Sequence, residues 1–510
     1  MEILARQRRY GRNYGAHRRH SAYRRGGTGG RQGLVCFYIL LCLGLIGSIV
    51  YMQWRMGNLR EVQARLSEFL QQQTADQTGE GLEDAAQEPM ETVRVLLLEN
   101  DTDTYRDSVG IVGDAGCVLD DGTRQWTSAP EEVVSFGAEN LASFTGTTVV
   151  TPAEGGYLYL VDETGARQQP GYRGTLEVWQ DANGYALVNE VSTEDYLACV
   201  LPSEMPESYG LEALKAQAVC ARSYLYAQTS QEHYPQFHAQ LDDTVSFQVY
   251  NHEASGALSA QAVQETAGQV LMCQGQIVNA LYYSTSCGFS QSGSIFGEDE
   301  QVFQSVYVGS GEAPQDFDSY IRGWDENAYE RDERYFRWVA VIDVAGRTAD
   351  IIDAVTDLKK KDGEDVVYSD SLKRRISDRK IATAAEAFGE LKSFQVVKRN
   401  AGGVIEEARL EFACGTVDVT GELHIRDILG AAQTSVQLQN GEIVTGIDRL
   451  YSAAFVLDAQ DGQWILRGGG CGHGAGMSQN GAKALAAEGW GCQDILHFFY
   501  QNVDIVRLPQ

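Results

Sequence analysis

The stretch Glu194-Asp-Tyr-Leu-Ala-Cys-Val-Leu-Pro-Ser-Glu-Met-Pro206, followed by Leu211-Glu-Ala-Leu-Lys-Ala-Gln-Ala-Val-Cys-Ala-Arg-Ser-Tyr224, contains the clearest helix signal of the chain. Apolar residues at helical spacing predict a helix over residues 209–228. We expect Ser208 to cap this helix. Pro206 disfavours helical backbone at the residue before it. The sequence therefore predicts that Glu204 lies on an extended loop between a strand and a helix, a usual place for catalytic groups.

Two cations of this predicted helix, Lys215 and Arg222, are seven residues apart. Their directions therefore differ by only about 20°. Both lie at the edge of the apolar stripe, where they could point together into a cleft near Glu204. A carboxylate with two nearby cations suits an oxygen-rich, anionic polymer. The alternative, which the pattern alone favours, is that both side chains cover the edge of the core and keep their charged ends in water.

The rest of the sequence after about residue 91 favours an α+β fold that is rich in strands and contains few helices. Short β-rich runs are separated by Asp, Gly and Asn turns. They predict strands near residues 93–98, 146–151, 157–161, 175–179, 269–272, 277–283, 407–412 and 455–457. Two closing helices are expected, at residues 479–488 and 493–501. Residues 311–400 are more charged and less periodic.

The N-terminal region has the pattern of a membrane anchor. Residues 1–33 hold nine Arg and one Glu, which leaves a net charge of -37 on residues 34–510, and this acidic body argues against a nucleic-acid partner. Residues 34–52 form an uncharged run of nineteen residues, close to the length that a membrane-spanning helix needs. The Arg-rich sequence before it predicts a cytoplasmic N-terminus. A cleaved signal peptide is the alternative, but no small-x-small cleavage site follows the run.

We therefore expect four regions and a single-pass cell membrane protein whose main domain is extracytoplasmic. They are a basic cytoplasmic arm (1–33), a transmembrane signal anchor (34–54), a stalk and linker (55–90) and the main domain (91–510). Eight of the ten cysteines follow residue 55, without a C-x-x-C pair, so a zinc ribbon is not indicated. Disulfides are permitted in that compartment, but spacing alone does not assign them.

A second constellation is the glycine-rich stretch Gly468-Gly-Gly-Cys-Gly-His-Gly-Ala-Gly-Met-Ser-Gln-Asn-Gly-Ala-Lys483. Its glycines allow tight turns and close approach of the backbone to a ligand. A glycine-rich loop before a helix can bind phosphate, but the stretch lacks the Gly-Lys-Ser/Thr ending of a P-loop. His473 could act as a base, and a hydrogen-bonded structural histidine is at least as consistent with the pattern.

These segments together resemble the stage II sporulation protein D (SpoIID) family, which includes the LytB-type amidase enhancers. The matching elements are Glu-Met-Pro-x-Ser with the helix after it, Gln248-Val-Tyr250, Ala280-Leu-Tyr-Tyr-Ser-Thr-Ser-Cys-Gly288 and Gly472-His-Gly-Ala-Gly-Met-Ser-Gln-x-Gly-Ala482. Weaker matches lie at residues 94–98 and 423–429. The resemblance runs from about residue 91 to residue 510 and is poor over residues 311–400, which suggests an inserted segment there.

The resemblance implies lytic transglycosylase activity, in which the muramoyl C6 hydroxyl attacks its own anomeric carbon and water takes no part. Such a reaction needs one acid/base, whereas ordinary glycosidases need two carboxylates. Glu204 matches the catalytic glutamate of the family. The other matched positions are implied to bind substrate: Lys215, Gln217, Arg222, Gln248, Tyr250, Ser284, His473, Ser478 and Gln479.

The sequence also departs from the family pattern. Some relatives hold a zinc ion with a His and two Cys, but those cysteine positions correspond to Asp242 and Phe247 here, with only His238 nearby, so we expect no metal and no cofactor. Cys287 and Cys471 each replace another residue of a family motif. This suggests a disulfide between them, with two buried free thiols as the equal alternative.

Two functions from different classes follow from the resemblance. The first is an enzyme that remodels peptidoglycan in the cell wall, during engulfment in sporulation or elsewhere. The second is a non-catalytic module that binds glycan and stimulates an N-acetylmuramoyl-L-alanine amidase. The implied partners are glycan strands, an amidase similar to stage II sporulation protein P, and other membrane proteins. A metal-dependent hydrolase lacks a ligand cluster in the sequence.

Overall fold

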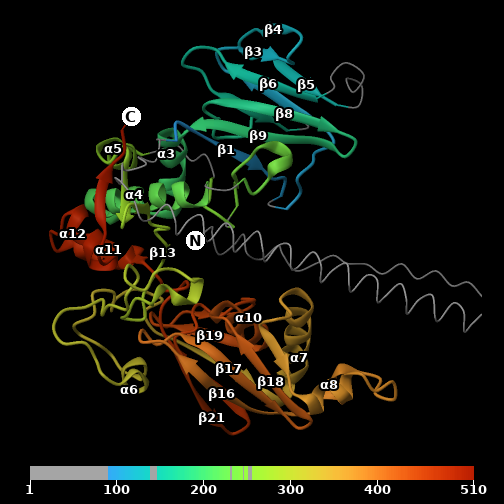
Figure 1. Ribbon diagram of the computed structural model, residues 1–510, viewed down its shortest axis with the longest axis vertical. Coiled ribbons are helices and arrows are strands. Elements are labelled where there is room, and N and C mark those ends of the chain that lie inside the picture. The colour runs from blue at the N-terminus through green and yellow to red at the C-terminus, as the bar shows by residue number, and fades with distance from the viewer. Residues whose placement is uncertain are drawn as a thin grey trace, which may run out of the picture. The chain divides into compact units, whose positions relative to one another are not determined.

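The computed structural model describes residues 90–509 apart from 101, 138–145, 163, 230–231, 245 and 251–255 (Figure 1). The chain divides into two compact units, Met1–Ala86 and Gln87–Gln510, and every described residue belongs to the second. The predicted arm, anchor and most of the stalk (residues 1–89) lie outside the described residues. No helix within the described ranges is long and apolar enough to cross a membrane.

The described chain begins with a mainly antiparallel sheet in the order β10-β1-β9-β8-β6-β3-β4. Its strands are β1 (Thr92–Leu97), β3 (Cys117–Asp120), β4 (Gln125–Ser128), β6 (Gly146–Pro152), β8 (Thr175–Asp181), β9 (Gly184–Ser192) and β10 (Leu241–Asp242). Val93, Val95 and Leu97 of β1 face the main core, whereas Leu96 faces a smaller cluster with Phe237, as the alternation of a strand requires. This main core also includes residues from the sheet β5 (Val133–Phe136), β2 (Val109–Gly113) and β7 (Leu158–Val161).

A group of helices around α4 (Leu211–Gln228) adjoins this core (Figure 1). The helices in contact with α4 are α3 (Thr193–Glu204), α5 (Ala257–Glu265), α11 (Gln479–Ala487) and α12 (Cys492–Phe499). Small alanine side chains along α4 let these neighbours approach closely, and most of them are fully buried. Two small sheets join the group, β12 (Gln276–Ile277) with β11 (Gln269–Cys273) and β24 (Asp504–Arg507), and β13 (Tyr282–Tyr283) with β23 (Met477–Ser478).

The start of α4 differs from the prediction. Residues Glu207–Tyr209 form a separate 3-10 turn, η2, and Gly210 rather than Ser208 is the N-cap. Gly210 has φ 90°, a left-handed conformation that glycine adopts far more readily than serine does. The chain therefore turns sharply between η2 and α4, and this places Tyr209 against α11.

Two further sheets and several helices form the part between residues 317 and 468. One sheet has the order β20-β19-β14-β22-β21 and the other β15-β18-β17-β16. Their strands are β14 (Trp338–Asp343), β15 (Val366–Tyr368), β16 (Leu391–Arg399), β17 (Ile405–Phe412), β18 (Gly415–Thr420), β19 (Ser435–Leu438), β20 (Ile443–Val444), β21 (Phe455–Gln460) and β22 (Gln463–Gly468). The helices are α6 (Phe317–Arg322), α7 (Val344–Lys361), α8 (Asp370–Ile376), α9 (Ala384–Phe388) and α10 (Glu422–Ala432).

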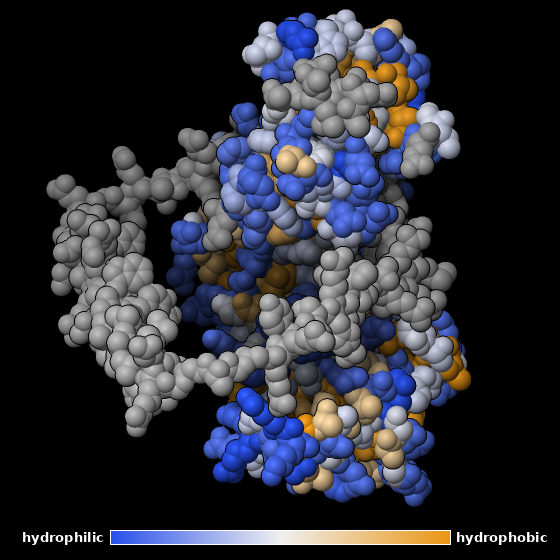
Figure 2. Space-filling model, turned by 90° about the vertical axis from the view of Figure 1, so that its right-hand side faces the viewer, coloured by the Kyte–Doolittle hydropathy of each residue, from blue (hydrophilic) through white to orange (hydrophobic). Residues whose placement is uncertain are grey.

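Residues 311–400 are more regular than their aperiodic sequence suggested. Helix α7 buries only Ile351, Ile352 and Val355 and exposes charged residues elsewhere, so its apolar stripe is narrow. Its last turn holds Lys359, Lys360 and Lys361, where the helix dipole favours cations. The structure is thus a mixed helix and strand fold, rich in strands, as the sequence predicts. Its surface is largely hydrophilic in the view of Figure 2, with scattered apolar patches.

Candidate active site

Glu204 is the last residue of α3. This helix begins after Ser192, whose hydroxyl accepts the N–H of Asp195 at 3.1 Å. It ends at Met205, which returns to extended backbone with φ -139° directly before Pro206. The predicted extended loop is therefore wrong for Glu204 itself, because the proline forces only Met205 out of the helix. The carboxylate is carried on a helix end, which positions it more rigidly than a loop would.

The side chain of Glu204 keeps some solvent contact, although its carboxyl group is largely enclosed. Its Oε1 accepts the N–H of Val249 at 3.3 Å, and Gln479 Nε2 donates to its main-chain carbonyl at 3.1 Å. Burial raises the pKa of Glu204 to about 7, because it disfavours the charged form more than the neighbouring donors stabilise it. Near neutral pH the group can therefore both donate and accept a proton.

Aromatic and amide groups surround this carboxyl. Three tyrosines near Glu204 have a pKa that is raised by burial, and the charge of Glu204 raises it further. They are Tyr196, Tyr224 and Tyr282. Gln248 connects two of them, since the Tyr196 hydroxyl donates to its Oε1 at 3.4 Å and its Nε2 donates to the Tyr282 hydroxyl at 3.1 Å. Gln248 thus lies beside the acid, as the family motif implies, but its amide is bonded inside the protein.

Two other predicted substrate-binding residues lie in the core. Tyr250 is buried, and its hydroxyl donates to Asn189 Oδ1 at 2.7 Å. Gln217 is buried on α4, and neither atom of its amide has a partner among the described residues. Neither side chain has surface for a glycan, so in this structure both support the fold behind Glu204.

Lys215 and Arg222 of α4 make separate ion pairs, so the interpretation in which both point together into a cleft beside Glu204 is wrong. The favoured alternative, with both charged ends in water, is wrong for Arg222, which is fully buried. Lys215 pairs with Glu212 at 2.8 Å and with Glu265 at 2.5 Å. Arg222 has no exposed surface, and its guanidinium binds both carboxylate oxygens of Glu194, at 2.9 Å and 2.6 Å. Their physical roles also differ, because Lys215 joins surface elements whereas Arg222 ties the start of α3 to the middle of α4.

The glycine-rich stretch forms a tight loop against β13. Gly470, Gly472, Gly474 and Gly476 all have positive φ, and a Cβ at Gly476 would lie 1.9 Å from the carbonyl oxygen of Leu281. The loop therefore needs glycine for close backbone approach. No phosphate function is required to explain it.

His473 is held by this loop as a neutral ring. Its Nδ1 accepts the N–H of Ala475 at 3.1 Å, so its Nε2 carries the proton and donates to the Tyr282 carbonyl at 3.0 Å. Burial lowers the pKa of His473 to about 4. Both ring nitrogens are bonded to the backbone, and His473 is therefore a structural histidine in this structure.

The first residues of α11 bring three segments together. Ser478 caps α11 by accepting the N–H of Gly481 at 3.2 Å, and the next residue is Gln479, which bonds to Glu204. Asn480 accepts from the Tyr209 hydroxyl at 2.7 Å and donates its main-chain N–H to the carbonyl of Ser284 at 3.0 Å. Ser284 thus contacts the start of α11, where Gln479 contacts Glu204, although Ser284 lies 194 residues before Ser478 in the sequence.

Glu330 completes this junction and was not identified from the sequence. It is buried and accepts hydrogen bonds from Ser478 Oγ at 2.6 Å, from the main-chain N–H of Ser286 at 3.0 Å and from the Ser286 hydroxyl. Burial raises the pKa of Glu330 to about 7. The residue lies in the region that matches the family pattern poorly, and no motif marks it among the many acidic residues of the chain.

The suggested disulfide is not formed. Cys287 and Cys471 are both free in the structure, although their segments adjoin through the bridge between Thr285 and Cys471. Burial raises the pKa of the Cys471 thiol to about 11, which keeps it protonated. The alternative of two buried free thiols fits Cys287, which is buried, whereas Cys471 is free but keeps some exposed surface.

The position that corresponds to a zinc ligand in some relatives is occupied by a buried hydrogen-bonded carboxylate. Asp242 accepts from the Tyr234 hydroxyl at 2.6 Å and from the Thr244 hydroxyl at 2.7 Å. Within the described residues, no group of three or more His, Cys, Asp or Glu side chains is arranged to hold a metal ion.

Comparison with known proteins agrees with the family that the motifs indicated. Residues 181–273, which include Glu204 and all of α4, match the family model SpoIID, described as "Stage II sporulation protein". The chain is 25% identical over 335 residues to "Stage II sporulation protein D" of Bacillus amyloliquefaciens, which covers 62% of this chain and 75% of that protein. It is 24% identical over 353 residues to the protein of the same name in Bacillus subtilis, covering 65% and 78% respectively.

A third relative carries a different name. The chain is 27% identical over 318 residues to "Amidase enhancer" of Bacillus subtilis. That match covers 60% of this chain but spans only 39% of the length of the amidase enhancer. The similarity to both groups confirms the predicted resemblance to the SpoIID/LytB family.

The buried acid should make the folded protein less stable as pH rises. An ordinary glutamate has a pKa of 4.5, whereas the pKa of Glu204 in the folded protein is about 7. The folded state therefore binds the proton more tightly than the unfolded state does. The contribution of Glu204 to the free energy of unfolding is therefore lost as pH rises from 4.5 through 7. Glutamine cannot ionise, so the Glu204→Gln variant does not lose stability in this way. We expect the variant to be more stable than the wild type by about 1–2 kcal/mol near pH 8, after allowing for partial exposure, and no different near pH 4. Urea unfolding at both pH values measures this, and equal stabilities near pH 8 would contradict the assignment.

The two cations of α4 should differ strongly in their effect on stability. Arg222→Ala removes a fully buried guanidinium with its bonds to Glu194 and to the Gln269 carbonyl and leaves a cavity in its place, so we expect a loss of about 2–4 kcal/mol in the free energy of unfolding. Lys215→Ala on the same helix breaks partly exposed ion pairs and should cost no more than about 1 kcal/mol. Thermal and urea unfolding of both variants test this, and similar losses for the two would show that burial does not set the difference.

Proposed function

We propose, from the SpoIID domain that this chain carries, that the protein is a lytic transglycosylase that cleaves the MurNAc–GlcNAc bonds of peptidoglycan glycan strands. The observation that carries the proposal is the state of Glu204. It is a carboxyl group on a helix end, partly open to solvent, with its pKa raised to about 7 by burial. An acid/base catalyst is most effective when its pKa lies near the operating pH.

The chemistry requires one group to act twice. Protonated Glu204 would donate its proton to the leaving glycosidic oxygen as the C1–O bond breaks. The resulting carboxylate would then take the proton of the muramoyl C6 hydroxyl as that oxygen bonds to C1, which closes a 1,6-anhydro ring and restores the acid. The neutral tyrosines and Gln248 around the carboxyl provide a low-dielectric setting in which this proton exchange is easier.

A mechanism with one carboxylate fits the site better than one with two. Hydrolysis by ordinary glycosidases needs a second carboxylate on the opposite side of the bond. Two other described carboxyl groups have a pKa raised by burial, Glu330 and Asp243. Glu330 is fully engaged by Ser286 and Ser478, and Asp243 accepts the N–H of Leu98 at 3.0 Å. Both are committed to the fold.

The second candidate is a non-catalytic enhancer of a cell-wall amidase. The similarity to a protein named "Amidase enhancer" favours it. An enhancer has no need for a carboxyl group whose pKa is kept near neutrality at a cost in stability, and for this reason we place the enzyme first. In either case the partner polymer is peptidoglycan, with an amidase acting on the same strands.

The proposal places the described domain outside the cell membrane. Residues 34–52 would form the anchor and residues 1–33 the cytoplasmic arm, as the charge pattern suggests. Protease treatment of intact protoplasts tests this topology: an epitope tag at the C-terminus should be lost, whereas a tag at the N-terminus should persist.

Digestion of glycan strands is the direct test of activity. Strands freed of stem peptides, incubated with the full chain in detergent, should yield 1,6-anhydromuramoyl ends detectable by mass spectrometry. Glu204→Gln should lower the rate at least about 100-fold, since general acid–base catalysis contributes that much or more. The matched control is Glu207→Gln, whose carboxylate accepts the N–H groups of Leu258 and Ser259 at the start of α5. Absence of anhydro ends with the wild type would favour the enhancer, and full activity of Glu204→Gln would move the acid to another residue.

The pH dependence of the reaction supplies an independent check. Because Glu204 must begin protonated and its pKa is about 7, kcat/KM should fall as pH rises through about 7. The measurement is initial rates over about pH 5 to 9 at low strand concentration. A profile that stays flat through neutrality would exclude Glu204 as the proton donor.

A further inference from the structure

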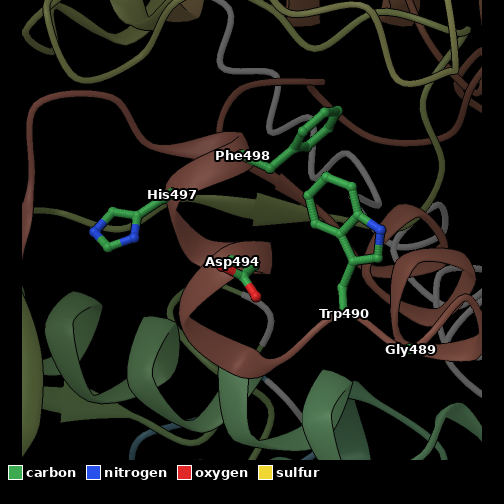
Figure 3. Close-up of a pocket in the computed structure, with 5 residues that line it drawn as sticks. All are labelled: Gly489, Trp490, Asp494, His497 and Phe498. Atoms are coloured by element: carbon green, nitrogen blue, oxygen red, sulfur yellow. The ribbon is translucent and has the colours of Figure 1, made fainter.

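A solvent-open pocket of about 510 Å³ is lined by α12 and by the turn that joins it to α11, and none of its lining residues contacts Glu204 (Figure 3). It is lined by Gly489, Trp490, Asp494, His497 and Phe498. Its volume falls within the range of small-ligand sites in proteins. Gly489 and Trp490 lie in the turn that follows α11, whereas Asp494, His497 and Phe498 belong to α12.

The pocket combines aromatic rings with free polar groups. Trp490 and Phe498 form an edge-to-face pair with centroids 5.8 Å apart and an interplanar angle of 86°. Residues 494, 497 and 498 share one face of α12, and Figure 3 shows the two aromatic rings on one side of Asp494 and the imidazole on the other. Among the described residues, the indole N–H, the Asp494 carboxylate and the His497 ring have no hydrogen-bond partner. The pocket therefore has an apolar wall and three unused polar groups.

This combination matches the two kinds of surface on a sugar ring. The C–H faces of a pyranose are apolar and pack on aromatic rings, whereas its hydroxyls and N-acetyl group need donors and acceptors at the edge. The Asp494 carboxylate can accept from hydroxyls or from the acetamido N–H, and the indole N–H can donate to a carbonyl. A free muramoyl lactyl group is anionic and would be repelled by Asp494. The chemistry therefore favours a neutral N-acetylated hexosamine.

The pocket is also placed to meet a strand that reaches Glu204. Gln479, at the first residue of α11, bonds to Glu204, whereas Trp490 lies just beyond the last residue, Ala487. A helix of nine residues is about 13 Å long. Between the two ends, Lys483 of α11 lies over the ring of Tyr209 at 5.1 Å. The two sites are thus separated by the length of a short oligosaccharide along one helix.

We infer that the pocket formed by Trp490, Phe498 and Asp494 is a distal subsite that binds a neutral N-acetylhexosamine unit of the same glycan strand that Glu204 acts on. The inference rests on the proposed glycan substrate. It does not require that the strand be cleaved. The subsite holds the strand while the bond several units away is positioned at the acid.

Binding measured without turnover tests this subsite. The full chain carrying Glu204→Gln is titrated in detergent with N-acetylchitohexaose and with peptide-free glycan strands, by isothermal titration calorimetry. Adding Trp490→Ala should weaken both affinities at least tenfold, and adding Asp494→Asn should weaken them several-fold. The control is Trp324→Ala, because this indole is 56% exposed and lies on a different part of the chain.

The outcomes separate the subsite from the catalytic proposal. Trp490 packs partly on the core, so Asp494→Asn, an exposed and nearly isosteric change, keeps the test decisive if Trp490→Ala fails to fold. Unchanged affinities for Asp494→Asn and for folded Trp490→Ala overturn the subsite, even where the protein with Glu204 intact produces anhydro ends. Weakened binding in both variants supports it, even where no cleavage is found.

Discussion

The ion pair between the buried Arg222 and the partly exposed Glu194 is the constraint on which the site depends. The Arg222 guanidinium binds both oxygens of Glu194 and also donates to the carbonyl of Gln269 at 3.1 Å, and Glu194 accepts the N–H of Gly268 at 3.2 Å. This set joins α3, α4 and the start of β11. A charge without solvent contact would be costly without such partners, so the three segments have a fixed mutual position. Glu204 lies at the far end of α3 from this pair, and its location follows from that geometry.

The other half of the site is fixed by polar contacts to the start of α11. Ser478 bonds to Glu330, Gln479 to Glu204 and Asn480 to Tyr209, so three consecutive residues hold three separate segments. Each contact buries polar groups with their hydrogen bonds made, which is the condition for a polar network to stabilise a unique arrangement. The family motifs are far apart in the sequence, but in the folded chain they meet at this junction.

The sequence predicted local structure well where one pattern dominated. The alternating run at β1 and the long apolar stripe of α4 both appear in the structure, within two residues at each end. Prediction from the sequence failed where the structure of a segment depends on a contact with residues far away in the sequence. Pro206 indicated that the helix breaks, but not that α3 continues as far as Glu204. Helical spacing placed Lys215 and Arg222 on similar faces of α4, but it did not reveal that each of them pairs with a different acidic residue. Glu330 had no local signal, because only the folded chain brings it to Ser286 and Ser478.

The bond from Gln479 to the carbonyl of Glu204 spans 275 residues of sequence. Glu204 is therefore synthesised well before Gln479, the residue that holds its helix end. Domains generally form as the chain emerges from the N-terminal side. A chain that has been synthesised only as far as α10 would carry Glu204 without its support from α11. The complete surroundings of Glu204 therefore form only after α11 has been made.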